Sequence, residues 1–387
     1  MKTILALYGA GRKSLLAAQC LLAREPDIVP KYLIENNDFS KMGNEIPLEN
    51  SDYGLKVISL AEFSKLYQAG ECQKVLVPAA YHIFDLREIR GLLQGRRIKA
   101  EDIWAMSYNR LFAPHDAEGP GLESYVQFDL LEQLFHVDIH IVDHCNLSCE
   151  ACAHFNNLVK ESVIYPAEQV LSSLRRLKEL CPSVTSFAIL GGGPLLHPEW
   201  RKIVSCIRDI FPFSSIDFVT NALLAKKLNA QDAALFKQSR VNFSISLYPP
   251  LQNSVDTLVA HLRKIELPFK MTRIDYFERR LIHEKKFSAQ RQHKKCGHDH
   301  CLRGTKIGYC VIALFTDYFN DYFDESKLPE DAGVDLFAVS SGRDLIDKLS
   351  SPLELCKQCV GCEAGKLFWK PWEKSQNPQP SDWWIEF

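Results

Sequence analysis

Three closely spaced cysteines constrain this chain more than any other feature of its sequence. Cys145, Cys149 and Cys152 have the spacing C-x3-C-x2-C, and an apolar, strand-like run at 137–142 leads directly into them. This order predicts a loop of three thiols at the end of a buried strand. Thiolates are soft ligands that select iron–sulfur clusters, zinc or Cu(I). A cubane cluster usually takes four cysteines, so three local ligands would leave one iron open. A structural zinc loop, or unrelated buried thiols, is the alternative at this point.

Length and charge limit the class of protein. The 387 residues correspond to two or three domains, at roughly 150 residues each. A net charge of −2 gives no electrostatic reason to expect binding to nucleic acid or to an anionic membrane. No apolar run approaches the roughly 20 residues that span a bilayer. We therefore expect a cytoplasmic protein, in which 13 cysteines indicate metal ligands rather than disulfides.

The first 112 residues follow the pattern of a Rossmann-like, doubly wound α/β domain. A strand at 3–8 ends in a glycine turn, a helix follows at 14–22, and a strand at 30–34 ends in Glu35. Gly9 and Gly11 match the first two positions of the dinucleotide fingerprint, but Ser14 stands at the third. Further strands are predicted at 55–59, 74–78 and 98–104, with helices at 60–68 and 86–93. The incomplete fingerprint leaves two equal interpretations: a nucleotide or nucleotide-sugar site at Gly9, Gly11 and Glu35, or a docking domain.

A Pro- and Gly-rich linker at 113–124 precedes a region of alternating strands and helices at 125–290. Repeated β/α units of this kind predict a parallel sheet that is closed or partly closed as a barrel, with sites at the carboxyl ends of the strands. Such ends are expected at three places besides the cysteine loop: residues 191–194, Thr220-Asn221, and Ser244 to Leu247. Strands are predicted at 137–142, 184–190, 216–220, 241–247 and 269–274, and helices at 166–180, 198–211, 230–238 and 254–265.

These motifs together resemble the radical S-adenosylmethionine (radical SAM) superfamily, whose signature is the same cysteine spacing. Residues 191–198 resemble its G-G-E-P-L-L-H-P stretch, with Gly193 in place of the usual Glu. Thr220-Asn221 resembles T-N-G, with Ala222 in place of Gly, and Ser244-Ile245-Ser246 resembles S-I-S. The resemblance covers about residues 135–365.

The resemblance implies a partial (β/α)6 TIM-like barrel and a site for a [4Fe–4S] cluster on Cys145, Cys149 and Cys152. The open iron would chelate the amino and carboxylate groups of SAM, and an electron from a flavodoxin or ferredoxin would yield a 5′-deoxyadenosyl radical. The implied SAM contacts are Gly191, Gly192, Gly193, Pro194, Thr220, Asn221, Ser244 and Ser246. Gly193 removes the carboxylate that meets the methionine amine in the superfamily.

Six further cysteines lie in the last hundred residues. Cys296, Cys301 and Cys310 are followed much later by Cys356, Cys359 and Cys362. The arrangement is similar to the auxiliary-cluster extensions (twitch or SPASM) of radical SAM enzymes, in which a Cys before a β-hairpin pairs with a later C-x2-C.

The similarity implies a second [4Fe–4S] cluster within an auxiliary domain at 291–387. The expected ligands are Cys301, Cys310, Cys356 and Cys359, with Cys296 able to replace Cys301 and Cys362 spare. A hairpin is expected at 305–315, with Cys310 inside it. A closed zinc site is the alternative. The aromatic tail that follows either covers the barrel mouth or forms an interaction patch.

We expect a radical SAM enzyme that modifies a sugar or nucleotide-sugar substrate in surface-polysaccharide assembly, by epimerisation, dehydration or deoxygenation. The basis for that substrate is the first domain, which looks like the small modules that accompany polysaccharide-biosynthesis enzymes. One alternative is a peptide-modifying maturase with an auxiliary cluster. The other is a non-catalytic iron–sulfur scaffold or redox sensor, which Gly193 favours. The sequence assigns no catalytic acid or base.

Overall fold

The computed structural model describes residues 2–36, 38–49, 52–78, 83–106, 133–212, 214–296, 300–324, 327–330, 333–361 and 368–385. The chain divides into two compact units, Met1–Phe135 and His136–Phe387, and each is described by itself. The expected linker at 113–124 and the spare Cys362 lie outside the described residues.

The described strands of the first unit form one sheet with the order β3-β4-β2-β1-β5-β6. All neighbouring pairs are parallel except β3 and β4. With β1 in the middle and the strand order reversing between β1 and β5, this is the topology of a doubly wound fold, as expected. The strands are β1 (Thr3–Tyr8), β2 (Ile28–Ile34), β3 (Glu45–Pro47), β4 (Gly54–Ile58), β5 (Lys74–Pro78) and β6 (Ile103–Met106).

Helices cover both faces of this sheet because its strands are apolar on both sides. Helix α1 (Arg12–Arg24) packs on the face that carries Leu5 and Leu7. Helices α2 (Leu60–Gln68) and α3 (Ile83–Gly95) contribute to the core on the other face, with Ala6 and Val75. The predicted strands and helices of this unit are present, except that the last strand, expected at 98–104, lies at Ile103–Met106 and follows a 3-10 turn at Ala100–Asp102.

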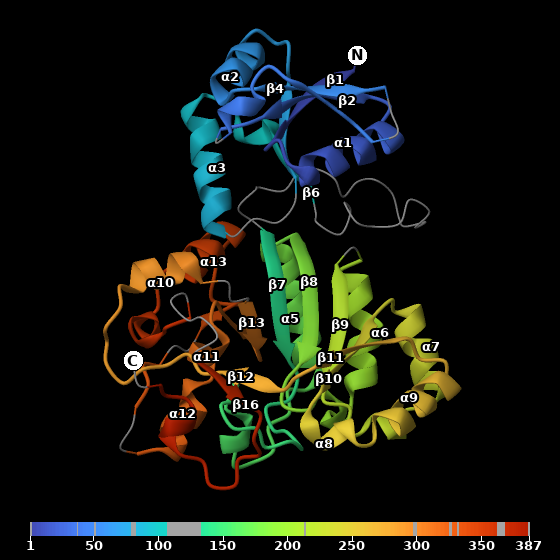
Figure 1. The fold of residues 1–387 in the computed structure, drawn as a ribbon, viewed down its shortest axis with the longest axis vertical. Helices are drawn as coiled ribbons and strands as arrows, with labels where there is room; N and C mark the ends of the chain where they lie inside the picture. The colour runs from blue at the N-terminus through green and yellow to red at the C-terminus, as the bar shows by residue number, and fades with distance from the viewer. Residues whose placement is uncertain are drawn as a thin grey trace. The chain divides into compact units, whose positions relative to one another are not determined.

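The second unit is built on a sheet with the order β11-β10-β9-β8-β7-β13-β14-β15 in the described part of the chain (Figure 1). β8 to β11 are mutually parallel, and β13 is parallel to β7. The strands are β7 (Gln133–His140), β8 (Ser183–Leu190), β9 (Ser215–Thr220), β10 (Asn242–Leu247), β11 (Phe269–Arg273), β13 (His300–Arg303), β14 (Lys306–Gly308) and β15 (Val334–Asp335).

The five predicted core strands are therefore present, and the sheet gains another parallel strand, β13, at the opposite side of β7. β7 ends at His140 rather than at Val142, and the two residues that follow it bond to Leu190 at the end of β8 and to Gly192 just after it. The Ile141 amide donates to the Leu190 carbonyl, and Gly192 donates to the Val142 carbonyl. Strand β13 comes from the cysteine-rich segment, so that segment shares its sheet with the barrel-like core.

The helices that connect the core strands follow the predicted order, and α5, α6, α7 and α9 lie along one side of the sheet (Figure 1). Local signals set their ends: Asn229 caps α7 by accepting from the amides of Gln231 and Asp232. The helices of the core are α5 (Ala167–Leu180), α6 (Trp200–Ile210), α7 (Ala230–Gln238), α8 (Pro249–Gln252) and α9 (Val255–Lys264).

The cysteine-rich segment differs from the prediction in one element. The expected hairpin at 305–315 is wrong in position: the hairpin is β13–β14, and Cys310 follows it as the residue that precedes helix α11 (Val311–Leu314). Residues 311–314 form a short helical turn in which all four apolar side chains are buried. The remaining elements are β12 (Tyr276–Glu278), α10 (Ala289–Lys295), α12 (Thr316–Tyr322), α13 (Gly342–Leu349) and β16 (Trp369–Pro371), which pairs with β12.

Among the described residues, no helix combines the length and the apolar character that a membrane crossing requires.

Candidate functional site

The three cysteines of the C-x3-C-x2-C motif lie on the loop that follows β7. Cys149 is buried, and Cys145 and Cys152 are partly buried. Burial, and then the nearby charge of Cys152, raises the pKa of Cys145 to about 11. The pKa of Cys149 is raised by burial and by the charges of Cys152 and Cys145. The three sulfurs are therefore close enough to repel one another as thiolates, and cations at this loop would relieve that repulsion.

The glycine run after β8 packs directly on this loop. The Gly192 amide donates to the Val142 carbonyl at 2.7 Å, and the Gly193 amide donates to the His144 carbonyl at 3.1 Å. A Cβ on Gly191 would lie 2.1 Å from the Val142 oxygen, and one on Gly192 would lie 2.0 Å from the His144 oxygen. Only glycine allows the two backbones to approach so closely.

The end of β9 reaches the same loop. The side-chain amide of Asn221 donates to Asn146 Oδ1 at 2.9 Å and lies 3.6 Å from Cys145 Sγ. Thr220 is turned to its own backbone, since its Oγ1 accepts from the amide of Ala222. Ala222 has φ of 58°, in the left-handed region that glycine adopts most easily. That backbone angle explains why a glycine is usual at this position of the resembled motif.

The residue that follows strand β10, Tyr248, is an aromatic site residue that the sequence analysis missed. Ser244 Oγ donates to Asp217 Oδ1 at 2.8 Å, whereas Ser246 interacts with Tyr248. Burial raises the pKa of Tyr248, and the charges of Cys149, Cys152 and Cys145 raise it further. Tyr248 therefore lies near the thiols. Continuing the alternation of Ser244 and Ser246 by two residues would have found it.

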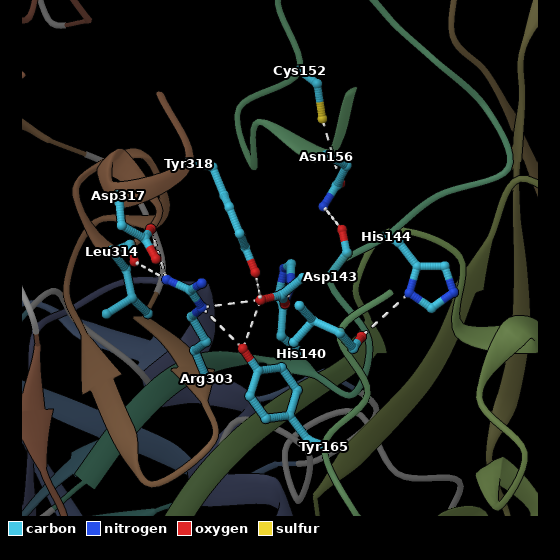
Figure 2. A network of polar contacts seen from close by, with 11 residues as sticks. His140, Asp143, His144, Cys152, Asn156, Tyr165, Arg303, Leu314, Asp317 and Tyr318 are labelled. Atoms are coloured by element: carbon cyan, nitrogen blue, oxygen red, sulfur yellow. Dashed lines mark hydrogen bonds and ion pairs between the residues drawn. The ribbon is translucent and has the colours of Figure 1, made fainter. Parts of the chain in front are cut away.

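A buried carboxylate anchors the start of the cysteine loop (Figure 2). Asp143 is 0% exposed and contacts four side chains: its carboxylate accepts from Tyr165 (2.6 Å), Tyr318 (2.7 Å) and Arg303 (3.1 Å) and lies 3.3 Å from His140 Nδ1. Burial acts to raise the pKa of Asp143, but His140 and Arg303 outweigh it and lower the pKa to about 2.

The same network extends from the loop in two directions. The Asp143 carbonyl accepts from the Asn156 side-chain amide at 2.5 Å, so both ends of the loop are joined. Arg303 also donates to Asp317 and to the Leu314 carbonyl, which links the loop to helices α11 and α12 (Figure 2). No sequence motif pointed to Asp143 or Arg303.

Four of the later cysteines line a second, enclosed pocket with an apolar wall. They are Cys296, Cys310, Cys356 and Cys359. Burial raises the pKa of Cys310, and the charges of Cys359, Cys296 and Cys356 add to this. Burial is the main cause that raises the pKa of Cys359 to about 12, and the charges of Cys296 and Cys356 raise it further.

Cys301 does not line this pocket. It is 0% exposed on β13, packed in a hydrophobic cluster with Phe315 and Leu355. The structure therefore brings together Cys296, and not Cys301, with the other three expected ligands. Within the described ranges, no three His, Cys, Asp or Glu side chains form a site for a single metal ion. Ligands of a four-iron cluster need not converge on one point, because each thiolate binds its own iron.

The candidate nucleotide residues lie at the central strand ends of the first unit. Gly9, with φ of 91°, and Gly11 form the turn between β1 and α1. Glu35 follows β2, and its Oε1 accepts from the amides of Asn36 and Asp38. Ser14 stands where a third glycine is usual. It is 2% exposed and its hydroxyl donates to the Tyr8 carbonyl, so a small polar residue still allows close packing of helix on strand.

Comparison with known proteins gives partial matches. No protein-family model matches the chain. Over 137 residues the chain is 34% identical to a GTP 3′,8-cyclase of Limosilactobacillus fermentum, a match that covers 33% of this chain and 37% of that protein. A GTP 3′,8-cyclase of a Cyanothece species is 27% identical over 129 residues, covering 32% of this chain and 39% of the relative. The matches thus span less than two-fifths of these curated relatives.

Over the matched third of its length, the chain is similar to radical SAM enzymes. Solved structures that are similar to it include BtrN in complex with AdoMet and 2-DOIA, with a TM-score of 0.37 and 12% identity over 58% of this chain and 93% of that one. Another is native anSMEcpe with bound AdoMet, with a TM-score of 0.37 and 14% identity over 59% of this chain and 90% of that one.

Radical SAM homologues use a [4Fe–4S] cluster and SAM. The residues of this chain fit that cluster, since three thiols share one loop and a glycine turn packs its backbone directly against that loop.

Proposed function

We propose that this chain is an enzyme that cleaves SAM reductively at a [4Fe–4S] cluster held by Cys145, Cys149 and Cys152. The observation that carries the proposal is the backbone pairing of Gly192 and Gly193 with the cysteine loop. Two motifs that lie some 40 residues apart in the sequence are thereby held side by side.

When bound, the cluster and SAM would supply a radical that abstracts hydrogen from an unactivated C–H bond. The protein's own part is to hold and orient. The three thiolates fix the cluster, and Asn221 fixes the loop through Asn146. Residues 191–194 present their backbone to the ligand, and burial of the loop excludes water from the site.

The expected SAM contacts divide into two groups. Gly191, Gly192, Gly193 and Asn221 lie against the cysteine loop, and together with Pro194, which follows Gly193, they are proposed to touch SAM. Ser246, together with Tyr248, is proposed to line the same space. Thr220 and Ser244 instead satisfy the amide of Ala222 and the carboxylate of Asp217, so we assign them to shaping the strand ends.

We propose a second [4Fe–4S] cluster on Cys296, Cys310, Cys356 and Cys359. The support is their convergence on one apolar, enclosed pocket. Cys296 precedes the β13–β14 hairpin, Cys310 follows it, and the last two form a C-x2-C pair. This cluster would hold substrate or pass an electron.

The substrate class is proposed from the first unit. Its parallel strand order, with the glycine turn at the end of β1 and Glu35 at the end of β2, is that of domains that bind nucleotides at the point where the strand order reverses. We propose a nucleotide-sugar substrate in surface-polysaccharide assembly, modified by epimerisation, dehydration or deoxygenation. A flavodoxin or ferredoxin would be the reducing partner.

The test is anaerobic reconstitution with iron and sulfide, followed by SAM and dithionite. We expect 5′-deoxyadenosine from the native chain and none from the Cys145/Cys149/Cys152→Ala variant. An intact cluster without any product would overturn the enzyme proposal and favour a scaffold or redox sensor.

Substrate is tested by adding nucleotide-sugars deuterated on the sugar ring and measuring deuterium in the 5′-deoxyadenosine. Glu35→Ala should weaken the thermal shift caused by the active nucleotide-sugar. Transfer of deuterium from a peptide, with none from any nucleotide-sugar, would replace the sugar proposal by peptide modification.

A further inference from the structure

A segment near the C-terminal end of the sequence lies along the cysteine loop, although more than 200 residues separate the two. We call residues 369–385 the strap. The Glu150 amide donates to the Glu373 carbonyl at 3.0 Å, and the Ser375 amide donates to the Ser148 carbonyl at 3.0 Å. Between them, Cys149 and Lys374 form an antiparallel bridge. The strap therefore adds a short strand to the loop that carries the thiols.

Side chains strengthen this pairing at both ends. The Lys370 ammonium forms an ion pair with the Glu150 carboxylate, in which both side chains are about one-fifth exposed (22% and 19%). The Trp383 indole donates to the Cys152 carbonyl at 2.9 Å, and its ring packs on Phe155. The aromatic tail was expected either to cover the barrel mouth or to form an interaction patch, and these contacts agree with the first role.

One strap residue reaches a sulfur itself. The indole Nε1 of Trp372 lies 3.1 Å from Cys149 Sγ, and indole is a donor only, so its N–H points at the sulfur. The Trp372 backbone is fixed as well, since its amide donates to the Asp275 carbonyl at 2.7 Å. The ring lies beside Tyr248, with centroids 6.5 Å apart. Backbone and ring contacts therefore both hold the indole in place.

We propose that Trp372 is a positioning residue that tunes the cluster on the cysteine loop, by donating its indole N–H to the Cys149 thiolate. The proposal rests on the proposed function, because it requires a cluster on that loop. A donor to a cluster sulfur stabilises the more electron-rich, reduced state, and hydrogen bonds to the sulfurs are one of the factors that set the potential of such clusters. The N–H of Trp372 thus raises the reduction potential and eases the one-electron reduction that SAM cleavage needs.

The test compares Trp372→Phe with Trp369→Phe in the reconstituted full-length chain. Both changes remove one indole from the same segment, but Trp369 is 51% exposed. The readout is a redox titration followed by electron paramagnetic resonance, using the signal that changes when SAM is added, which separates this cluster from any other. We expect Trp372→Phe to make reduction three- to tenfold less favourable, where tenfold for one electron is about 59 mV. Trp369→Phe should leave the potential at the native value.

A second variant separates the effect of losing the N–H donor from the effect of losing ring packing. Benzothienylalanine at position 372 keeps both fused rings and replaces only the N–H by sulfur. It should lower the potential as Trp372→Phe does.

An unchanged potential in this variant, with the SAM-responsive signal present, would overturn the role of Trp372 and leave the proposed function intact. Absence of a SAM-responsive signal from the native chain would instead overturn the proposed function, and with it this inference.

Discussion

Arg303 Nε lies 3.1 Å from Asp143 Oδ2, which ties strand β13 to the residue two positions before Cys145. The carboxylate is fully buried and the Arg303 side chain is 16% exposed, so neither charge has much access to water. Asp143 also takes hydrogen bonds from Tyr165 and Tyr318. The position of the cysteine loop therefore depends on a residue of the cysteine-rich segment.

Replacing Arg303 by Met should destabilise the fold strongly. The change leaves the Asp143 charge buried without the Arg303 guanidinium, although His140 remains beside it, and breaking a buried pair from one side costs about 3 kcal/mol. Urea unfolding followed by circular dichroism measures the loss. Arg273→Met is the matched control, since Arg273 pairs with Asp275 at an exposed position and should unfold like the native chain. Equal unfolding midpoints for the two variants would show that the buried pair is not important for stability.

Acid should destabilise the native chain partly through Asp143. Its pKa of about 2 in the folded state lies below the ordinary value near 3.9, so the group stabilises the fold above about pH 4. That stabilisation, about 2 kcal/mol, is lost as the pH falls from about 4 towards 2. Denaturant unfolding of metal-free protein at a series of pH values should show a smaller loss over this range for Asp143→Asn than for the native chain. Parallel curves would contradict the prediction.

Adding a methyl group at Gly192 should displace the cysteine loop. The new Cβ would lie 2.0 Å from the His144 oxygen, which is backbone and cannot move without moving the loop. We expect Gly192→Ala to lower stability by about 1–3 kcal/mol and to reduce the iron bound. Gly193→Ala is the control from the same turn, because its Cβ would meet the flexible end of Leu196 at 3.1 Å. Native iron content in Gly192→Ala would refute the close packing.

The two candidate ligands Cys296 and Cys301 should differ in iron binding. Only Cys296 lines the pocket shared with Cys310, Cys356 and Cys359. In a background without the first three cysteines, Cys296→Ala should lose most of the roughly four remaining iron atoms per chain, whereas Cys301→Ala should retain them. Iron and sulfide assays give the counts. The reverse pattern would restore Cys301 as the ligand.

The sequence was sufficient for the parts of the fold that local pattern determines. Strand β10 alternates Phe243, Ile245 and Leu247 with serines, and α7 begins directly after the capping residue Asn229, so both were predicted within a residue. The hairpin was misplaced because residues 311–314 are apolar throughout, and a short apolar run does not distinguish strand from helix.

Long-range relationships were the part that the sequence did not reveal. The sequence spacing of Cys296 and of Cys301 suits a cluster ligand equally well. Only the pairing of β13 with β7 places the Cys301 side chain in the core. Asp143 and Arg303 are 160 residues apart, and Trp372 follows Cys149 by 223 residues. No spacing in the sequence identifies either contact, because each contact depends on which strands and segments become neighbours in the folded chain.

The late position of the strap in the sequence also determines when the site can be completed during protein synthesis. A ribosome that adds roughly 5–20 residues per second takes roughly 10–45 seconds to make the chain between Cys149 and Trp372. Throughout that interval the thiols are present without the segment that pairs with their loop and donates to Cys149. Iron delivered during synthesis meets an uncovered loop, and iron delivered afterwards meets a covered one, so the order of translation and metal delivery belongs to the assembly of this site.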